Sequence, residues 1–257
     1  MIKFYINSPL EQFEFHYLLG IFTPFINLSW ANITNFSLYC IIIFSLFYYG
    51  FNLIFFNNKL IGSNWSLVQE AIYDTILNIN ISQIGNNKES GYFFPFLYSL
   101  FILILLSNLT SMIPYSFALN SHIIFVLSLS WIVWFGVTIT GFYHHGLKFF
   151  SLFVPSGTPP VLVPVLVLIE LLSYAARAFS LGLRLGANII AGHLLLAILA
   201  NLIFTLISIS YLTFILGIIP FLGIFLIVCL EFGIASLQAY VFTILAAGYL
   251  KDGLFLH

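Results

Sequence analysis

Charged side chains are scarce in this chain of 257 residues. It has seven lysines and arginines and eight aspartates and glutamates, so only 6% of its residues are charged. A water-soluble domain carries about 25% charged residues. Hydrophobic residues make up 61% of the chain and the mean hydropathy is +1.10. The shortage of charge excludes a water-soluble domain and indicates an integral membrane protein.

Three further absences exclude classes of function. The net charge of −1 and the scattered lysines leave no basic stripe for nucleic acid. The two cysteines, Cys40 and Cys229, lie far apart in apolar runs, and we interpret them as buried free thiols. The sequence has no P-loop, metal-ligand set or nucleophile constellation. We therefore expect a protein that performs no bond chemistry itself and holds no cofactor.

Phenylalanine (30) and tyrosine (14) are abundant, together with isoleucine and asparagine, as expected when AT-rich codons dominate a gene. Organelle genomes commonly show this bias, so we hypothesise mitochondrial encoding. The first 30 residues lack the pattern of a secretory signal. Residues 1–7 are a candidate for a short cleaved leader.

The apolar segments predict an all-α membrane protein with a single domain over 1–257. We expect a first spanning helix over 34–57, which has the length that one bilayer crossing needs. A short polar link predicts an antiparallel helical hairpin over 92–143. After a proline-rich break, a second and longer hairpin is expected over 161–252.

A different pattern appears over 65–83, where apolar residues recur at spacings of three and four. This pattern predicts an amphipathic helix. Such a helix lies along the membrane surface, or it docks another subunit through its acidic face, and the residues favour neither alternative.

The only arginines, Arg177 and Arg184, lie in one long apolar stretch. An arginine at membrane depth costs several kcal/mol unless it meets a partner or water, so we interpret both as candidate functional residues. Glu170, Arg177 and Arg184 are spaced by seven and share one helical face, with Asn188 close to it. His193 lies about half a turn away and should face a different neighbour.

The last apolar segment carries Glu231 and Gln238 on one face and Asp252 at its end. Buried acidic groups need water, a proton or a partner. If the two long segments form an antiparallel hairpin, one register brings the polar residues together in three layers. These layers are Glu170 with Asp252, Arg184 with Gln238, and His193 with Glu231.

At 1.5 Å per residue, the Glu170 layer lies about 21 Å from the Arg184 layer, and the His193 layer about 14 Å away on the other side. Histidine and carboxylate groups can exchange protons near neutral pH, whereas arginine stays charged and repels a passing cation. Two titratable clusters that flank a fixed positive charge predict two offset proton pathways with an electrostatic barrier between them.

Each of these residues also has a structural interpretation, because Arg177 could pair with Glu170 and Gln238 could join two helices by a hydrogen bond. Other functional classes also use buried charges. One is a self-contained channel or secondary transporter, although the paired broken helices of many transporters are missing. Another is a haem-binding electron carrier, although His193 stands alone in its segment.

Several motifs resemble those of ATP synthase subunit a, also called subunit 6, over nearly the whole chain. The segments SPLEQFE and QEAIYDTI resemble fungal mitochondrial members. The motifs are AARAFSLGLRLGANIIAGH at 175–193, IPYSFALNSH at 113–122, FVPSGTPP at 153–160, YLKDGLFLH at 249–257, SPLEQFE at 8–14 and QEAIYDTI at 69–76.

The resemblance implies a pair of long tilted helices packed on a ring of c subunits, with Arg184 at the position of the family's essential arginine. It places His193 and Glu231 in a half-channel open to the intermembrane space, and Glu170 and Asp252 in a half-channel open to the matrix. We add Asn188 and Gln238 to the proton-translocating set and treat Arg177 as secondary.

The resemblance also implies the setting of the chain. It would be a multi-pass stator subunit of the mitochondrial inner membrane, in contact with lipid, the c-ring, the peripheral stalk and other membrane-sector subunits. The transported ion would be the proton, and ATP would be made elsewhere in the complex.

Overall fold

The structure is a computed structural model that describes residues 11–19, 33–56, 64–85, 88–113, 116–154, 162–209 and 217–255. Helices dominate it, so the expected all-α fold is confirmed. The candidate leader, 1–7, lies outside the described residues. The α-helices are α1 (Asn35–Phe56), α2 (Asn64–Ile84), α3 (Lys88–Ser111), α4 (Ile123–His145), α5 (Val163–Ile209) and α7 (Ile218–Leu254).

Short elements connect the helices. Two strands, β1 (Tyr17–Leu19) and β2 (Ile33–Thr34), form an antiparallel pair just before α1. The remaining elements are 3-10 helices: η1 (Glu11–Phe13), η3 (Leu119–Ser121) and η4 (Gly146–Phe153).

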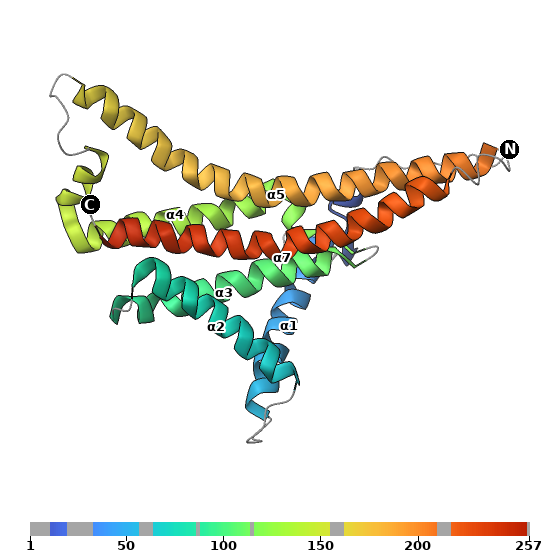
Figure 1. Cartoon of the computed structure of the whole chain (residues 1–257), viewed down its shortest axis with the longest axis horizontal. Coiled ribbons are helices and arrows are strands. Elements are labelled where there is room, and N and C mark those ends of the chain that lie inside the picture. The colour runs from blue at the N-terminus through green and yellow to red at the C-terminus, as the bar shows by residue number, and fades with distance from the viewer. Residues whose placement is uncertain are drawn as a thin grey trace, which may run out of the picture.

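Helix α7 lies at the centre of the packing, in contact with α2, α3, α4 and α5 (Figure 1). Its buried face carries the small residues Ala235, Ala239, Ala246 and Ala247, which let neighbouring helices approach closely. Phe242 fills the space between them and is fully buried. Because α3 and α4 both pack on α7, the hairpin expected over 92–143 is held together largely through α7.

The two longest helices, α5 and α7, both extend along the longest axis of the molecule and contact each other, and the beginning of α5 turns away from α7 (Figure 1). They contain 47 and 37 residues, which correspond to about 70 Å and 55 Å. Both exceed the roughly 30 Å thickness of a bilayer core, so they must be steeply tilted in a membrane. Pro164 and Pro220 lie in their first turns, where proline removes no helical hydrogen bond.

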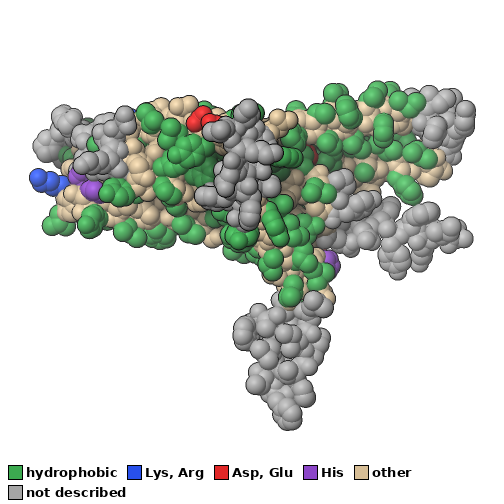
Figure 2. Space-filling view, turned by 90° about the horizontal axis from the view of Figure 1, so that it is seen from below, with side chains coloured by type: hydrophobic (Ala, Val, Ile, Leu, Met, Phe, Trp, Pro, Cys, Tyr) green, Lys and Arg blue, Asp and Glu red, His purple; other side chains and the backbone are tan. Residues whose placement is uncertain are grey.

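The outer surface is apolar, as the composition requires. Figure 2 shows a face on which hydrophobic side chains predominate and charged groups are few. Among the described residues, four helices are long and apolar enough to cross a membrane, namely α3, α4, α5 and α7, and α1 contributes a shorter apolar stretch, Asn35–Gly50. Within an 18-residue apolar stretch of α5, only 6% is buried inside the chain, whereas 39% of the corresponding stretch of α3 is buried. Helix α5 therefore leaves most of this surface for lipid or another subunit. Cys229 is also exposed, so its interpretation as a buried thiol is wrong.

Helix α2 buries apolar positions of its second half within the protein, whereas Leu67 and Val68 of its first half are exposed. Ile76 and Ile79 pack in the main core, and Asn80 donates a hydrogen bond to the Ser90 carbonyl at 2.8 Å. Glu70 and Asp74 remain exposed on other faces. The amphipathic pattern therefore docks α2 on α3 and α7, and its acidic face stays available to a second partner.

Candidate functional site

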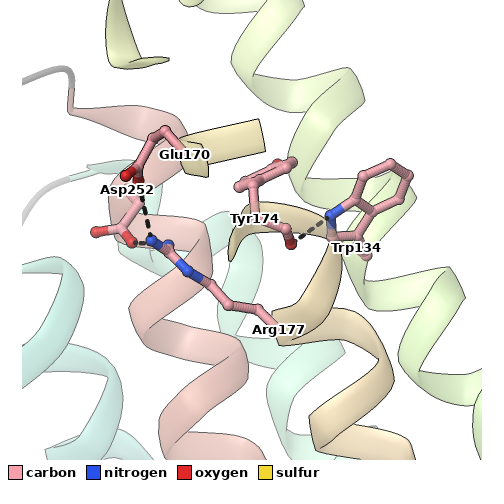
Figure 3. Close-up of polar contacts among 5 residues, drawn as sticks. All are labelled: Trp134, Glu170, Tyr174, Arg177 and Asp252. Atoms are coloured by element: carbon pink, nitrogen blue, oxygen red, sulfur yellow. Dashed lines mark hydrogen bonds and ion pairs between the residues drawn. The ribbon is translucent and has the colours of Figure 1, made fainter. Parts of the chain in front are cut away.

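A charged cluster joins α5 to α7 through Arg177 (Figure 3). Its Nη1 lies 3.2 Å from Asp252 Oδ2, and its Nη2 lies 3.5 Å from Glu170 Oε1. The three side chains are 32–37% exposed, so they are partly accessible. The alternative in which Arg177 pairs with Glu170 is observed, and Asp252 joins the same guanidinium. Glu170 and Asp252 thus share a layer with the arginine between them.

Tyr174 packs against Arg177, and further aromatic side chains hold Tyr174 in place. The guanidinium carbon lies 6.0 Å from the ring centroid of Tyr174, within the range of a cation–π contact. Trp134 of α4 donates a hydrogen bond from Nε1 to the Tyr174 carbonyl at 3.2 Å (Figure 3). Phe153 of η4 packs edge-on against Tyr174. The cluster is therefore tied to α4 and η4 as well as to α7.

Arg184 lies on the outer surface of α5, and within the described part of the chain it makes no hydrogen bond or ion pair. Five exposed residues near it along the helix are small, although Phe179, Leu183 and Asn188 are exposed there as well; the small ones are Ser173, Ala176, Ser180, Ala187 and Ala191. Small side chains let the backbone of another helix approach closely. An unpaired arginine at membrane depth requires such a partner or water.

Gln238 accepts a hydrogen bond at 3.2 Å from Asn188, one turn beyond Arg184 on α5, and among the described residues no hydrogen bond joins Gln238 to Arg184. The expected layer of Arg184 with Gln238 therefore stays a prediction. Helices α5 and α7 are long and bent, so the pairing of their side chains can change along their length (Figure 1). Gln238 is 6% exposed, and its Nε2 is buried without a hydrogen-bond partner in the described part of the chain.

Glu231 of α7 lies against Gly192 of α5. A Cβ built at Gly192 would lie 2.8 Å from the Glu231 carboxyl carbon, so a larger residue at this position would displace the carboxylate. His193 and Glu231 are half-buried. Among the described residues, His193 Nε2 and both Glu231 carboxylate oxygens are buried without a hydrogen-bond partner. Such groups need water or a proton, because leaving them unsatisfied is costly.

Two cavities meet at these residues. The first, which we call the access cavity, has a volume of about 740 Å³ and reaches the N-terminal segment. The second, the inner cavity, has a volume of about 380 Å³ and reaches Asn188. Met112, His193 and Glu231 line both. Two neighbouring spaces that share these three residues therefore extend from the N-terminal segment to a residue one helical turn from Arg184.

A buried amide network beside this site was missed from the sequence. Asn120 donates at 2.6 Å to both Ser107 Oγ and Asn108 Oδ1, and Asn108 donates at 3.0 Å to the Ala235 carbonyl, one turn beyond Glu231. Both asparagines are fully buried. The sequence feature that could have indicated this network is Asn108, because an amide side chain within an apolar spanning segment needs a hydrogen-bond partner.

The groups in this region form ion pairs around Arg177, and those at His193 and Glu231 lack hydrogen-bond partners among the described residues. Over the described ranges, no three His, Cys, Asp or Glu side chains come together in a way that could hold a metal ion. The partly exposed cluster around Arg177 lies on one side of Arg184 along α5, and the lined cavities lie on the other.

Comparison with known proteins gives the family. The model of the ATP synthase A chain family matches residues 16–251. The chain is similar to the ATP synthase subunit a of Candida glabrata (60% identical over 261 residues, covering 100% of this chain and 98% of the relative). It is also similar to those of Kluyveromyces lactis (57% over 259 residues, 100% of each) and Saccharomyces cerevisiae (53% over 257 residues, 100% and 99%). The chain therefore belongs to the ATP synthase A chain family.

Proposed function

We propose that this chain carries protons through two offset half-channels that lie on either side of Arg184. The observation that supports this most directly is the pair of cavities that share His193 and Glu231 and lead toward Arg184. The second support is the carboxylate cluster around Arg177 on the other side of Arg184.

Membership of the family supplies the setting. The chain is a non-catalytic stator subunit of the membrane sector of the mitochondrial ATP synthase, and it spans the inner membrane several times. It works with the c-ring and other membrane-sector subunits, and protons are the transported ion. Membership of this family excludes the two other functional classes that the sequence left open, the self-contained transporter and the haem-binding electron carrier.

In the first half-channel, protons pass from the access cavity to Glu231 and His193. The carboxylate and imidazole atoms that lack partners are free to bind water or a proton. The inner cavity then leads to Asn188, whose amide is hydrogen-bonded to Gln238. From there a proton reaches a carboxylate of the ring, which lies against the exposed face of α5.

Arg184 forms the barrier between the half-channels. A guanidinium group is a fixed positive charge in proteins, so it repels a proton that would pass directly. Its exposure at the centre of a stripe of small residues supports contact with a ring helix. A ring carboxylate that meets Arg184 is stabilised in its ionised form and therefore gives up its proton.

In the second half-channel, the proton leaves past Glu170 and Asp252. Glu170 precedes Arg184 by 14 residues, which places it about 21 Å away along α5. With one arginine and two carboxylates, the cluster has a formal charge of −1, which favours a proton that arrives from the ring. Partial exposure of all three side chains allows exchange with water.

The test of this function is ATP-driven proton pumping and passive proton leak in vesicles that contain the assembled complex. We expect Arg184→Ala to abolish pumping while the complex still assembles. Lys148→Ala, which removes an exposed cation of η4, is the control and should pump normally. Unchanged coupled pumping in Arg184→Ala would contradict the proposal and leave this arginine with a structural role.

A further inference from the structure

We infer that the N-terminal segment 11–19 forms a wall of the access cavity, and that Gln12 and His16 provide the polar mouth through which water and protons reach His193 and Glu231. This inference rests on the proposed function. It adds a part of the chain, and two residues, that the half-channel assignment does not contain.

The segment has a fixed place in the fold. Strand β1 pairs with β2, with Tyr17 opposite Thr34, and the Asn35 amide donates to the His16 carbonyl at 3.1 Å. Phe15 stacks on His122, with ring centroids 4.3 Å apart. Backbone pairing on one side of His16 and ring stacking beside it therefore fix the segment over the start of α1 and α4.

The beginning of α1 supports this position. The Thr34 amide donates to Ser37 Oγ at 3.0 Å, and the Ser37 amide donates to Thr34 Oγ1 at 3.4 Å. Reciprocal bonds of this kind satisfy the free amides at a helix start. Strand β2 and helix α1 are thus joined rigidly, and the segment paired to β2 is positioned by them.

The segment also touches the proton-binding residues. The ring of Phe13 meets the ring of His193 edge-on, with centroids 6.3 Å apart and an angle of 85° between the planes. Gln12 and His16 line the same cavity as His193 and Glu231. The segment thus forms one side of the space in which the buried carboxylate lies.

The side chains that line the access cavity indicate what Gln12 and His16 do there. The α5 and α7 walls beyond His193 and Glu231 are apolar, with Leu196, Ile224 and Val228 among them. A water molecule inside a protein needs two to four polar partners. Gln12 and His16, both exposed, supply donors and acceptors at the outer end of the cavity, and further polar side chains in its lining are Asn35, Tyr39, Ser111 and Ser116. The half-buried His193 and Glu231 supply them at the inner end.

Cysteine labelling in the intact ATP synthase tests this inference. Cys40 and Cys229 are free thiols and are first replaced by serine. Gln12→Cys and His16→Cys are then treated, in mitoplasts, with a membrane-impermeant methanethiosulfonate that carries a trimethylammonium group. ATP synthesis is measured per assembled complex before and after labelling. Glu14→Cys is the matched control, because Glu14 lies between the two positions, is exposed and is not part of the cavity lining.

We expect all three cysteines to be labelled, and ATP synthesis to fall about tenfold only for Gln12→Cys and His16→Cys. The added cation then occupies the mouth of the proton pathway. Labelling without loss of synthesis would overturn the inference, because the positions would lie off the proton route. Absence of labelling at both positions, with Glu14→Cys labelled, would also overturn it.

Two further variants make the result independent of the label. His16→Gln keeps hydrogen-bonding groups at the mouth and should retain most of the activity, whereas His16→Leu should lower it several-fold. Equal activity of these two variants would contradict a polar role for His16.

Glu231→Gln, measured in the same preparation, separates the two proposals. If Glu231→Gln loses synthesis while the labelled Gln12→Cys and His16→Cys complexes stay active, only the role of the segment fails. If Glu231→Gln is as active as the parent complex, the proposed half-channel fails.

Discussion

The side chains of Asn188 and Gln238 join α5 to α7 by a hydrogen bond of 3.2 Å, one helical turn beyond Arg184. The bond lies between the inner cavity, which Asn188 lines, and the buried face of α7, which carries Gln238. It therefore fixes the backbone of α5 beside Arg184 at the point where the proposed half-channel reaches the ring. Because Arg184 itself has no partner among the described residues, its position depends on neighbours such as this pair.

The first prediction concerns this pair. Asn188→Ala and Gln238→Ala should each lower ATP-driven proton pumping, because each removes the same interhelical bond. The double variant should then pump no more slowly than the slower single variant, because the effects of two substitutions that remove the same hydrogen bond do not add. Pumping per assembled complex is the measurement. Effects that multiply in the double variant would show that the two amides act independently.

The second prediction concerns the contact of Gly192 with Glu231. Gly192→Ala introduces a Cβ 2.8 Å from the Glu231 carboxyl carbon, so the carboxylate must move. We expect proton pumping to fall about 10-fold to 100-fold, since a small displacement of a reacting group has effects of this size. Gly233→Ala of α7 is the control, because its Cβ would meet nothing within 4 Å. Equal pumping in the two variants would mean that the position of Glu231 is unimportant.

The third prediction concerns Arg177 and its carboxylates. Arg177→Ala leaves Glu170 and Asp252 without the cation that they share, and we expect several-fold less assembled complex. Arg177→Ala combined with Asp252→Asn should recover part of this loss, because one uncompensated charge is removed. Native gels of the membrane fraction measure it.

Lys251→Ala is the control for this cluster, because it removes an exposed cation adjacent to Asp252 in sequence. It should assemble at the parental level. If the double variant assembles less well than Arg177→Ala alone, the loss of charge balance does not explain the effect of the arginine.

The sequence could predict the helices, because a bilayer imposes long apolar segments with polar interruptions. It also identified the charged residues within the long apolar helices, since an ionisable residue in such a segment is conspicuous whatever its partners are. His193 with Glu231 and Glu170 with Asp252 come together in the structure, although Arg177 lies between the second pair.

Other features depend on how the helices bend and pack. Among the described residues, Gln238 bonds to Asn188 and not to Arg184, and the pairing of side chains between two bent helices can change along their length. The central place of α7 between α3 and α4 also does not follow from short connections. The position of Gln12 and His16 in the access cavity depends on the β1–β2 pair, and three-residue and two-residue strands leave too short a pattern to read.

The last prediction concerns the buried network of Asn120. Asn120→Ala removes the hydrogen bonds to Ser107 and Asn108, and leaves their buried oxygens without this donor. Loss of such a donor costs about 1–3 kcal/mol, which lowers the level of a folded protein several-fold. Because Asn108 binds the Ala235 carbonyl one turn beyond Glu231, the remaining complexes should also pump more slowly.

Ser128→Ala, which removes an exposed hydroxyl of α4, is the control for both assembly and pumping. Normal assembly of Asn120→Ala at elevated temperature would show that the network does not stabilise α7.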